Sequence, residues 1–138
     1  MGFGNDNVKH IIATISDPGA TGKKILLFKA PSRISIRSAT IASSNAQGAG
    51  SAGNFELQNF GTAGTAIKAG AAGTIAAAAG GTASSARLAA NTPGAFTIGK
   101  PDVASGEYVY CAYTETGDFV EGLVTIDISY VDGLGGAA

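Results

Sequence analysis

The chain has 138 residues, the length of one ordinary domain and enough to bury a hydrophobic core without metal ions or disulfides. Charged residues make up 14% of it and the formal net charge is −1, so the basic patch that binds nucleic acid is not expected. Its single cysteine excludes an intramolecular disulfide and a multi-cysteine zinc site, and no apolar run approaches the ~20 residues of a membrane-spanning helix.

The first strand is predicted from alternating side chains. Residues 1–7, which precede it, are small and polar, and we expect an arm that orders against a neighbouring molecule. Residues 8–16 form a strand whose apolar face contains Ile11 and Ile15, because successive strand residues point to opposite faces. Residues 17–22 contain a proline and two glycines, which predicts a turn.

Residues 23–30 are apolar on both faces. Ile25 and Leu27 fall on one face, and Leu26 and Phe28 fall on the other. Such a run is typical of a central strand, or of a strand whose outer face meets another subunit.

Residues 33–43 form a strand whose apolar side chains change phase. Ile34 and Ile36 share one phase, whereas Ile41 is out of phase with both. One extra residue reverses the face that a side chain takes, so a bulge near residues 38–40 is predicted.

The middle of the chain, residues 61–90, is rich in glycine and alanine. It follows a strand over residues 54–60, in which Phe55 and Leu57 point inward. We favour a long loop with one short strand near residues 74–77, because the alanine run is too short and too closely flanked by glycines for a helix. The alternative is a stretch shaped for contact, since small side chains let backbones approach closely and long loops in compact domains are usually functional.

The end of the chain carries the clearest strand signals. Residues 107–114 are rich in aromatic and β-branched side chains, and within residues 123–133 the run 124–130 alternates strictly between apolar and polar. We interpret these two runs as antiparallel partners joined by the loop 115–122, and as the most secure part of the core. A short strand over residues 96–98 precedes them.

Turn residues at nearly every gap separate about eight strands, and there is no convincing amphipathic helix. This spacing predicts an all-β fold, an antiparallel two-sheet sandwich or jelly roll. The expected domain organisation is a flexible arm over residues 1–7, a single β-sandwich over residues 8–133 and a flexible tail over residues 134–138.

No set of residues is suited to catalysis, to a metal or to a resident cofactor. His10 is the only histidine, and no Gly-x-Ser-x-Gly elbow accompanies it, so we interpret it as an ordinary strand residue. Gly22 and Lys23 lack the earlier glycine and the following Ser or Thr of a phosphate loop. Cys111 lies among tyrosines and is interpreted as a small buried hydrophobe.

Acidic residues crowd the loop 115–122, where Glu115, Asp118 and Glu121 lie close in sequence. Carboxylates in a loop can hold Ca²⁺, and a carboxylate pair can cleave a glycosidic bond. The chain has no tryptophan to form a sugar platform. We favour a solvated loop over a calcium site, and a calcium site over catalysis.

The layout of the whole chain resembles that of small jelly-roll virion proteins of tailed bacteriophages, the capsid decoration (cement) and head-fibre proteins. The resemblance is one of pattern and involves no diagnostic motif. It includes an apolar strand that ends in Lys-Ala-Pro at residues 29–31, the run Arg-Ile-Ser-Ile-Arg-Ser-Ala-Thr-Ile at 33–41, and the closing segments 104–109 and 125–133.

The resemblance implies a non-enzymatic virion protein that is made in the host cytoplasm. It implies binding to the outer surface of the major capsid protein lattice as a homo-oligomer, with a trimer favoured, and no nucleic acid or membrane partner. The arm and the loop 61–79 are the expected contact segments. The contact residues expected within them are Gly2, Phe3, Gly4, Asn5, Asp6, Asn7, Ile67 and Ile75.

Two other functions stay open. One is a receptor- or glycan-binding module of a phage head or tail fibre, which would use the acidic loop 115–122 with or without calcium. The other, less favoured, is a small carbohydrate-active or hydrolytic enzyme.

Overall fold

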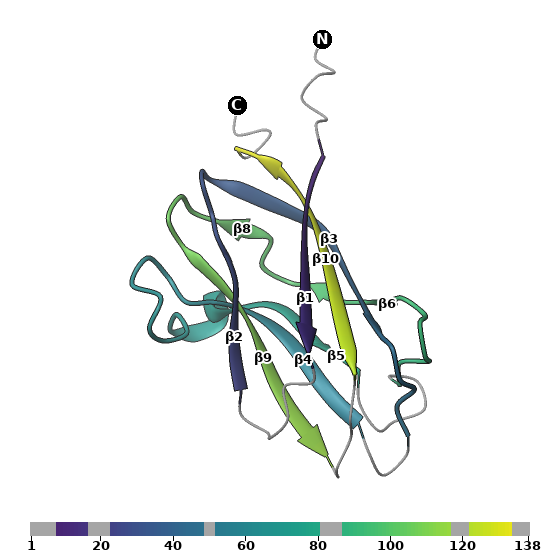
Figure 1. Cartoon of the computed structure of the whole chain (residues 1–138). Coiled ribbons are helices and arrows are strands. Elements are labelled where there is room, and N and C mark those ends of the chain that lie inside the picture. Colours follow the sequence, from purple (N-terminus) through teal and green to yellow (C-terminus); the bar gives the residue numbers. More distant parts are fainter. Residues whose placement is uncertain (1–7, 17–22, 49–51, 81–86, 117–121, 134–138) are drawn as a thin grey trace.

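The computed structural model describes residues 8–16, 23–48, 52–80, 87–116 and 122–133, and these residues form two antiparallel β-sheets that pack face to face (Figure 1). The first sheet, sheet A, contains β1 (Lys9–Ser16), β10 (Leu123–Asp132), β3 (Ile34–Ser43), β6 (Gly94–Ala95) and β8 (Asp102–Val103). The second, sheet B, contains β2 (Lys23–Lys29), β9 (Tyr108–Thr116), β4 (Ala52–Asn59), β5 (Thr74–Ala79) and β7 (Thr97–Ile98).

The strands pair in a nested order. β1 pairs with β10, β2 with β9, β3 with β6 and β8, and β4 with β5. The two sheets are completed by the pairs β10–β3 and β9–β4. A long antiparallel hairpin that is rolled up gives this order, which is the arrangement of a jelly roll. The predicted fold class is therefore confirmed.

The core lies between the sheets and follows the predicted alternation. Phe55 and Leu57 of β4 are fully buried, as are Val124 and Ile126 of β10 on the facing sheet. Phe55 and Tyr113 pack together with ring centroids 4.9 Å apart. Large apolar side chains from both inner faces thus form one contiguous cluster, which is what holds a sandwich together.

The predicted pairing of the last two strands is wrong. β9 lies in sheet B between β2 and β4, whereas β10 lies in sheet A between β1 and β3. The two strands therefore belong to different sheets and are not hydrogen-bonded neighbours. Alternation correctly located both strands, but it carries no information about which strand is the neighbour.

The predicted phase change in β3 is confirmed as a bulge. Ser38 pairs with Ser129 and Ile36 pairs with Tyr130, so Arg37 is the extra residue. Arg37 and Ser38 both point outward and are exposed, and the strand then continues with Ala39 buried. The bulge lies just before the predicted range of residues 38–40 and reverses the phase as expected.

A second bulge, in β2, changes the faces that the sequence predicts. Leu26 pairs with Tyr110 and Phe28 pairs with Val109, which leaves Leu27 as the extra residue. Both Leu27 and Phe28 therefore pack against the core, together with Ile25, and of these apolar side chains only Leu26 is exposed. β2 is an edge strand of sheet B and not a central one.

The alanine-rich middle contains a strand and not a helix, as predicted. β5 follows a short 3₁₀ turn, η2 (Gly70–Gly73). The predicted strand at residues 96–98 divides instead at Phe96 into β6, which pairs with β3 in sheet A, and β7, which pairs with β5 in sheet B. This segment thus joins the two sheets along one side of the sandwich, with Phe96 buried between them. Among the described residues, no helix is long and apolar enough to cross a membrane.

Candidate functional site

The clearest surface feature is a loop that is fixed against one end of sheet B. It comprises residues 60–73, between β4 and β5, and is called here the platform loop. Its first residues continue the pairing with β9, because the Phe60 N–H donates to Tyr108 O at 2.8 Å and the Tyr108 N–H donates to Gly61 O at 3.0 Å. The loop then turns back, and the Lys68 N–H donates to Asn59 O at 2.9 Å.

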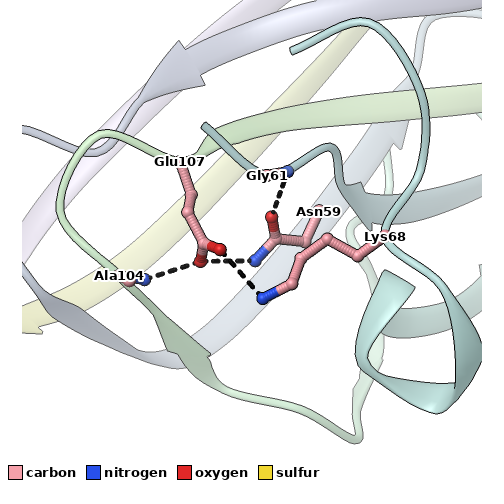
Figure 2. A network of polar contacts seen from close by, with 5 residues as sticks. All are labelled: Asn59, Gly61, Lys68, Ala104 and Glu107. Atoms are coloured by element: carbon pink, nitrogen blue, oxygen red, sulfur yellow. Dashed lines mark hydrogen bonds and ion pairs between the residues drawn. The ribbon is translucent and has the colours of Figure 1, made fainter. Parts of the chain in front are cut away.

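A buried carboxylate ties this loop to the turn before β9 (Figure 2). Glu107 is 7% exposed. One of its oxygens, Oε1, accepts from Asn59 Nδ2 at 3.0 Å and from the Ala104 N–H at 2.8 Å. Its Oε2 accepts from Lys68 Nζ at 2.8 Å. Asn59 in turn accepts from the Gly61 N–H at 2.8 Å, so one network joins β4, the platform loop and the β8–β9 turn.

These contacts keep Glu107 ionised. Burial acts to raise the pKa of its carboxyl, but the hydrogen bonds from Lys68, Asn59 and the Ala104 N–H outweigh burial, and the pKa lies below its ordinary value. A carboxylate that accepts several hydrogen bonds is favoured in its charged form. The network therefore acts as an ionic clamp on the platform loop at neutral pH.

Aromatic side chains of β9 pack against the platform loop. The Tyr110 hydroxyl donates to Gly64 O at 3.0 Å, and the Tyr110 ring stacks on Phe60 with centroids 4.0 Å apart. Gly64 has a φ of +71°, and a Cβ placed there would lie 2.7 Å from the Tyr108 ring. Only glycine combines this backbone conformation with so close an approach. The loop is therefore pressed onto the outer face of β9.

The structure separates the two isoleucines that the sequence predicts as partner contacts. Ile67 lies in the platform loop with 39% of its surface exposed. Its side chain rests on Gly73, where an added Cβ would lie 2.6 Å from Ile67 Cγ1. Ile75 in β5 is fully buried in the core of this chain and does not reach the surface. The predicted arm contacts, residues 2–7, lie outside the described residues.

A shallow polar trough of about 160 Å³ lies on the outer face of sheet B, beside the platform loop. Lys24 Nζ donates to Gln58 Oε1 at 3.0 Å, and Gln58 Nε2 donates to Glu56 Oε1 at 2.5 Å. The Lys24 ammonium also lies 5.9 Å from the centroid of the Phe60 ring, within the range of a cation–π contact. The trough is lined by Lys24, Asn54, Glu56, Gln58, Ala112 and Thr114.

His10 lies on the outer face of sheet A. Its Nδ1 is 2.8 Å from Asp127 Oδ1, and both side chains are substantially exposed. Ser129 is directly opposite His10 on β10, but its hydroxyl is 2.6 Å from the hydroxyl of Ser38. The three residue types of a Ser-His-Asp triad thus share a face, while the serine hydroxyl bonds to Ser38.

The other reactive groups that the sequence singles out are placed as follows. Cys111 is fully buried, and burial raises the pKa of its thiol to about 12. Glu115 accepts from the Tyr113 hydroxyl at 2.7 Å, whereas the other two acidic residues of the 115–122 loop lie outside the described residues. Within the described part of the chain, no three His, Cys, Asp or Glu side chains are grouped in a way that could hold a metal ion.

Sequence reasoning missed the clamp on the platform loop. Asn59, Lys68 and Glu107 come from separate segments, and no motif links them. One signal was available, because Glu107 stands at the start of an apolar aromatic strand in a chain with few charges. A charge at such a position is expected to have a partner if it becomes buried.

No protein-family model matches the sequence, and neither does any curated protein. Among solved structures, the fold is similar to a chain in the capsid of Ralstonia phage GP4, with a TM-score of 0.58 and 16% identity, over 91% of this chain and 83% of that chain. A structure of infectious bursal disease virus Gx strain aligns with a TM-score of 0.45 and 17% identity, over 93% of this chain and 33% of that chain. This chain thus spans about a third of the length of the second protein. At 16% identity, the likeness to the phage capsid chain shows that the two share a fold.

Proposed function

We propose that this chain is a structural protein of a bacteriophage virion, and that it binds the outer surface of the major capsid lattice as a decoration (cement) protein. The observation that carries the proposal is the likeness to a chain in the capsid of Ralstonia phage GP4, which covers 91% of this chain and 83% of that chain. Both shares are high, so most of each chain takes part in the likeness.

The platform loop is the segment of the described chain best suited to dock on a shell. It presents Ile67, and Ala63, Ala66 and Ala69 of the same loop are also exposed. The clamp at Glu107 and the contact of Gly64 with Tyr108 hold it in one shape before binding. A preorganised loop loses little conformational entropy on binding, and small side chains allow close approach.

A decoration protein of this kind stabilises a shell by mass action. It binds the assembled lattice and not the separated subunits, so each occupied site adds free energy to the assembled state. We expect the protein to act as a homo-oligomer, a trimer being favoured, with its arm of residues 2–7 adding contacts to neighbouring molecules. It is made in the host cytoplasm and acts on the capsid surface.

The test uses purified virions and the isolated protein. Mass spectrometry of intact particles should give copy numbers of the same order as those of the major capsid protein. Particles that lack the protein should lose their shell integrity at a lower temperature than complete ones, and adding the protein back should restore it. A copy number of a few per particle, or shells whose melting is unchanged by the protein, would contradict the proposal.

Two substitutions and one deletion test where the docking surface lies. Ile67→Asp should weaken binding to stripped particles at least about tenfold, which corresponds to about 1.4 kcal/mol. Leu123→Asp is the matched control, because Leu123 is exposed to 55% at the start of β10, away from the platform loop. Deletion of residues 2–7 should also weaken binding. Unchanged occupancy after that deletion would remove the arm from the interface.

The polar trough favours a second candidate function, a receptor- or glycan-binding module of a head or tail fibre. Its mixture of a lysine, a glutamate and side-chain amides offers both donors and acceptors to a hydroxylated ligand. A glycan panel with wild type and Glu56→Ala would detect such binding. A low copy number, with host adsorption lost on chelation while heads stay intact, would favour the fibre over the decoration protein.

A further inference from the structure

The edges of the two sheets are protected unequally. An exposed edge strand offers unpaired N–H and C=O groups to any other strand, and proteins prevent such pairing with lysines, bulges or very short edges. β2, at one edge of sheet B, contains three lysines, Lys23, Lys24 and Lys29, and it also has the bulge at Leu27. On the opposite side of the sandwich, β6, β7 and β8 are two residues long each.

β1, the edge of sheet A, has none of these protections along most of its length. It pairs with β10 over eight residues without a register shift. Among the described residues, its other side has no backbone partner. Ile12 at its centre is 66% exposed, more than any other large apolar side chain described. Its single lysine, Lys9, stands at one end and is held by Asp132.

We propose that β1 pairs in antiparallel fashion with β1 of a second copy of this chain, so that the two copies share one continuous sheet across a two-fold axis. Residues directly opposite each other in an antiparallel pair point to the same face. Because faces alternate along β1, an even-numbered residue can pair only with an even-numbered residue of the partner copy, and an odd-numbered one only with an odd-numbered one. The register centred on Ile12 brings Ile12 against the partner's Ile12 and covers the most exposed apolar side chain.

The sequence of β1 is self-complementary in this register. Lys9 comes opposite the partner's Ile15, and His10 comes opposite the partner's Thr14. No cation faces its own copy, whereas like charges placed directly opposite each other destabilise a strand pair. A register centred on His10 would shorten the overlap and place the two imidazoles together. A second copy is thus the occupant that the strand itself specifies.

This pairing goes beyond the proposed function and does not depend on it. If the protein also forms trimers, however, a two-fold contact between three-fold oligomers would connect them into a net. Binding to particles and pairing of β1 are measured separately, so either can fail while the other stands.

The first experiment measures the mass of the purified full-length protein in solution over a range of concentrations, by sedimentation equilibrium. We expect wild type to double its oligomer mass as concentration rises. Ile12→Lys, which gives β1 the protection that β2 has, should raise the dissociation constant of this step at least tenfold. Leu26→Lys is the matched control, since Leu26 is 49% exposed on the other long edge, and it should leave association unchanged.

A cross-linking experiment tests the register and does not rely on the lysine variant folding normally. Opposite Cα atoms in an antiparallel pair lie about 4.5–5.5 Å apart, within the range that a disulfide spans. Ile12→Cys should therefore oxidise to a covalent dimer. In Thr14→Cys the two new thiols would be four residues out of register, about 14 Å apart, and should not cross-link. The native Cys111 is fully buried and gives little background.

Specific outcomes would overturn the proposal. The first is a wild type that stays at one mass at all concentrations while Ile12→Cys cross-links no faster than Leu26→Cys. The second is an equal loss of association in Ile12→Lys and Leu26→Lys. The third is cross-linking of Thr14→Cys in preference to Ile12→Cys. Association lost only in Ile12→Lys, with a disulfide formed only at position 12, would establish it.

Discussion

Replacing Glu107 by glutamine tests the clamp on the platform loop. A glutamine keeps one carbonyl oxygen, which can still accept from Asn59 and from the Ala104 N–H. It places an amide NH₂ group where Oε2 now accepts from Lys68 at 2.8 Å. The variant thus removes one charge-assisted hydrogen bond and preserves the two contacts to the other oxygen.

The expected loss in the free energy of unfolding of Glu107→Gln follows from that single contact. A hydrogen bond to a charged group contributes about 1.5–3 kcal/mol to the free energy of unfolding. The Lys68 side chain is 37% exposed, so water can solvate its ammonium once the partner is gone. We therefore expect the low end, a loss of about 1.5–2 kcal/mol, which for a domain of this size lowers the Tm by roughly 6 °C. Glu107→Ala also leaves Asn59 and the Ala104 N–H without this acceptor and should cost about 4 kcal/mol.

The assay is urea unfolding of wild type, Glu107→Gln, Lys68→Met and the double variant, which together form a double-mutant cycle. The cycle should give a coupling of about 1.5 kcal/mol between the two side chains, because each contacts the other directly. A coupling of zero, or a Glu107→Gln variant as stable as wild type, would refute the clamp.

The stability of the same variants can also be measured as a function of pH. The pKa of Glu107 is lower in the folded chain than in the unfolded chain, so its contribution is fully present above the ordinary value of 4.5 and is lost as the pH falls through the folded pKa. The stability difference between wild type and Glu107→Gln should therefore shrink below about pH 4.5. Other carboxylates titrate in both proteins and cancel in the difference. A constant difference down to pH 3 would show that the carboxylate charge is not what the clamp uses.

Three further predictions concern the loop, the core and the thiol. Gly64→Ala should destabilise the fold by about 2 kcal/mol or more, measured by thermal unfolding, because its Cβ would collide with the Tyr108 ring; Gly70→Ala shares a φ of +71° but meets nothing within 4 Å, so it should cost only about 1 kcal/mol. Phe55→Ala should cost about 3–5 kcal/mol in urea unfolding, since the ring is fully buried against Tyr113, and a loss under 1 kcal/mol would argue against this packing. Cys111 should not react with a thiol reagent at pH 8 until the protein unfolds, because burial raises its pKa to about 12; rapid modification of the native protein would contradict its position.

The alternation of apolar and polar side chains was enough to predict the strands and much of the core. Phe55 and Leu57 point inward as expected, and so do the alternate residues of β10. The phase change in β3 also indicated a bulge near residues 38–40, and the extra residue is Arg37. These features are local, because the alternation of faces along a strand depends only on the strand itself.

The pairing of the strands could not be predicted from the sequence, because it depends on contacts between residues far apart in the chain. The last two strands looked like a hairpin, yet each pairs with strands from the first half of the chain. The faces of β2 were misassigned for a related reason. Its bulge at Leu27 becomes visible only in the register with β9, and it turns Phe28 toward the core.

The candidate site was predicted only in part. Glycine and alanine indicated a long loop, with a segment shaped for contact as the alternative, and Ile67 is exposed there. Ile75 looked equivalent, but the β-strand that follows η2 places it on the inner face. The clamp residues come together only through the fold, because Asn59, Lys68 and Glu107 share no spacing that a sequence pattern could reveal.

The position of β10 has a consequence for how the chain reaches its native state. Sheet A is completed by inserting the last strand between β1 and β3, which come from the first third of the sequence. Until a ribosome has released residues 123–132, both of these early strands lack β10 as a neighbour and expose unpaired backbone on that side. Such distant closures are slow, typically milliseconds to seconds, so nascent copies depend on the release of β10 before they meet one another. A chain cut short before Leu123 should therefore accumulate as aggregate instead of as a smaller folded domain.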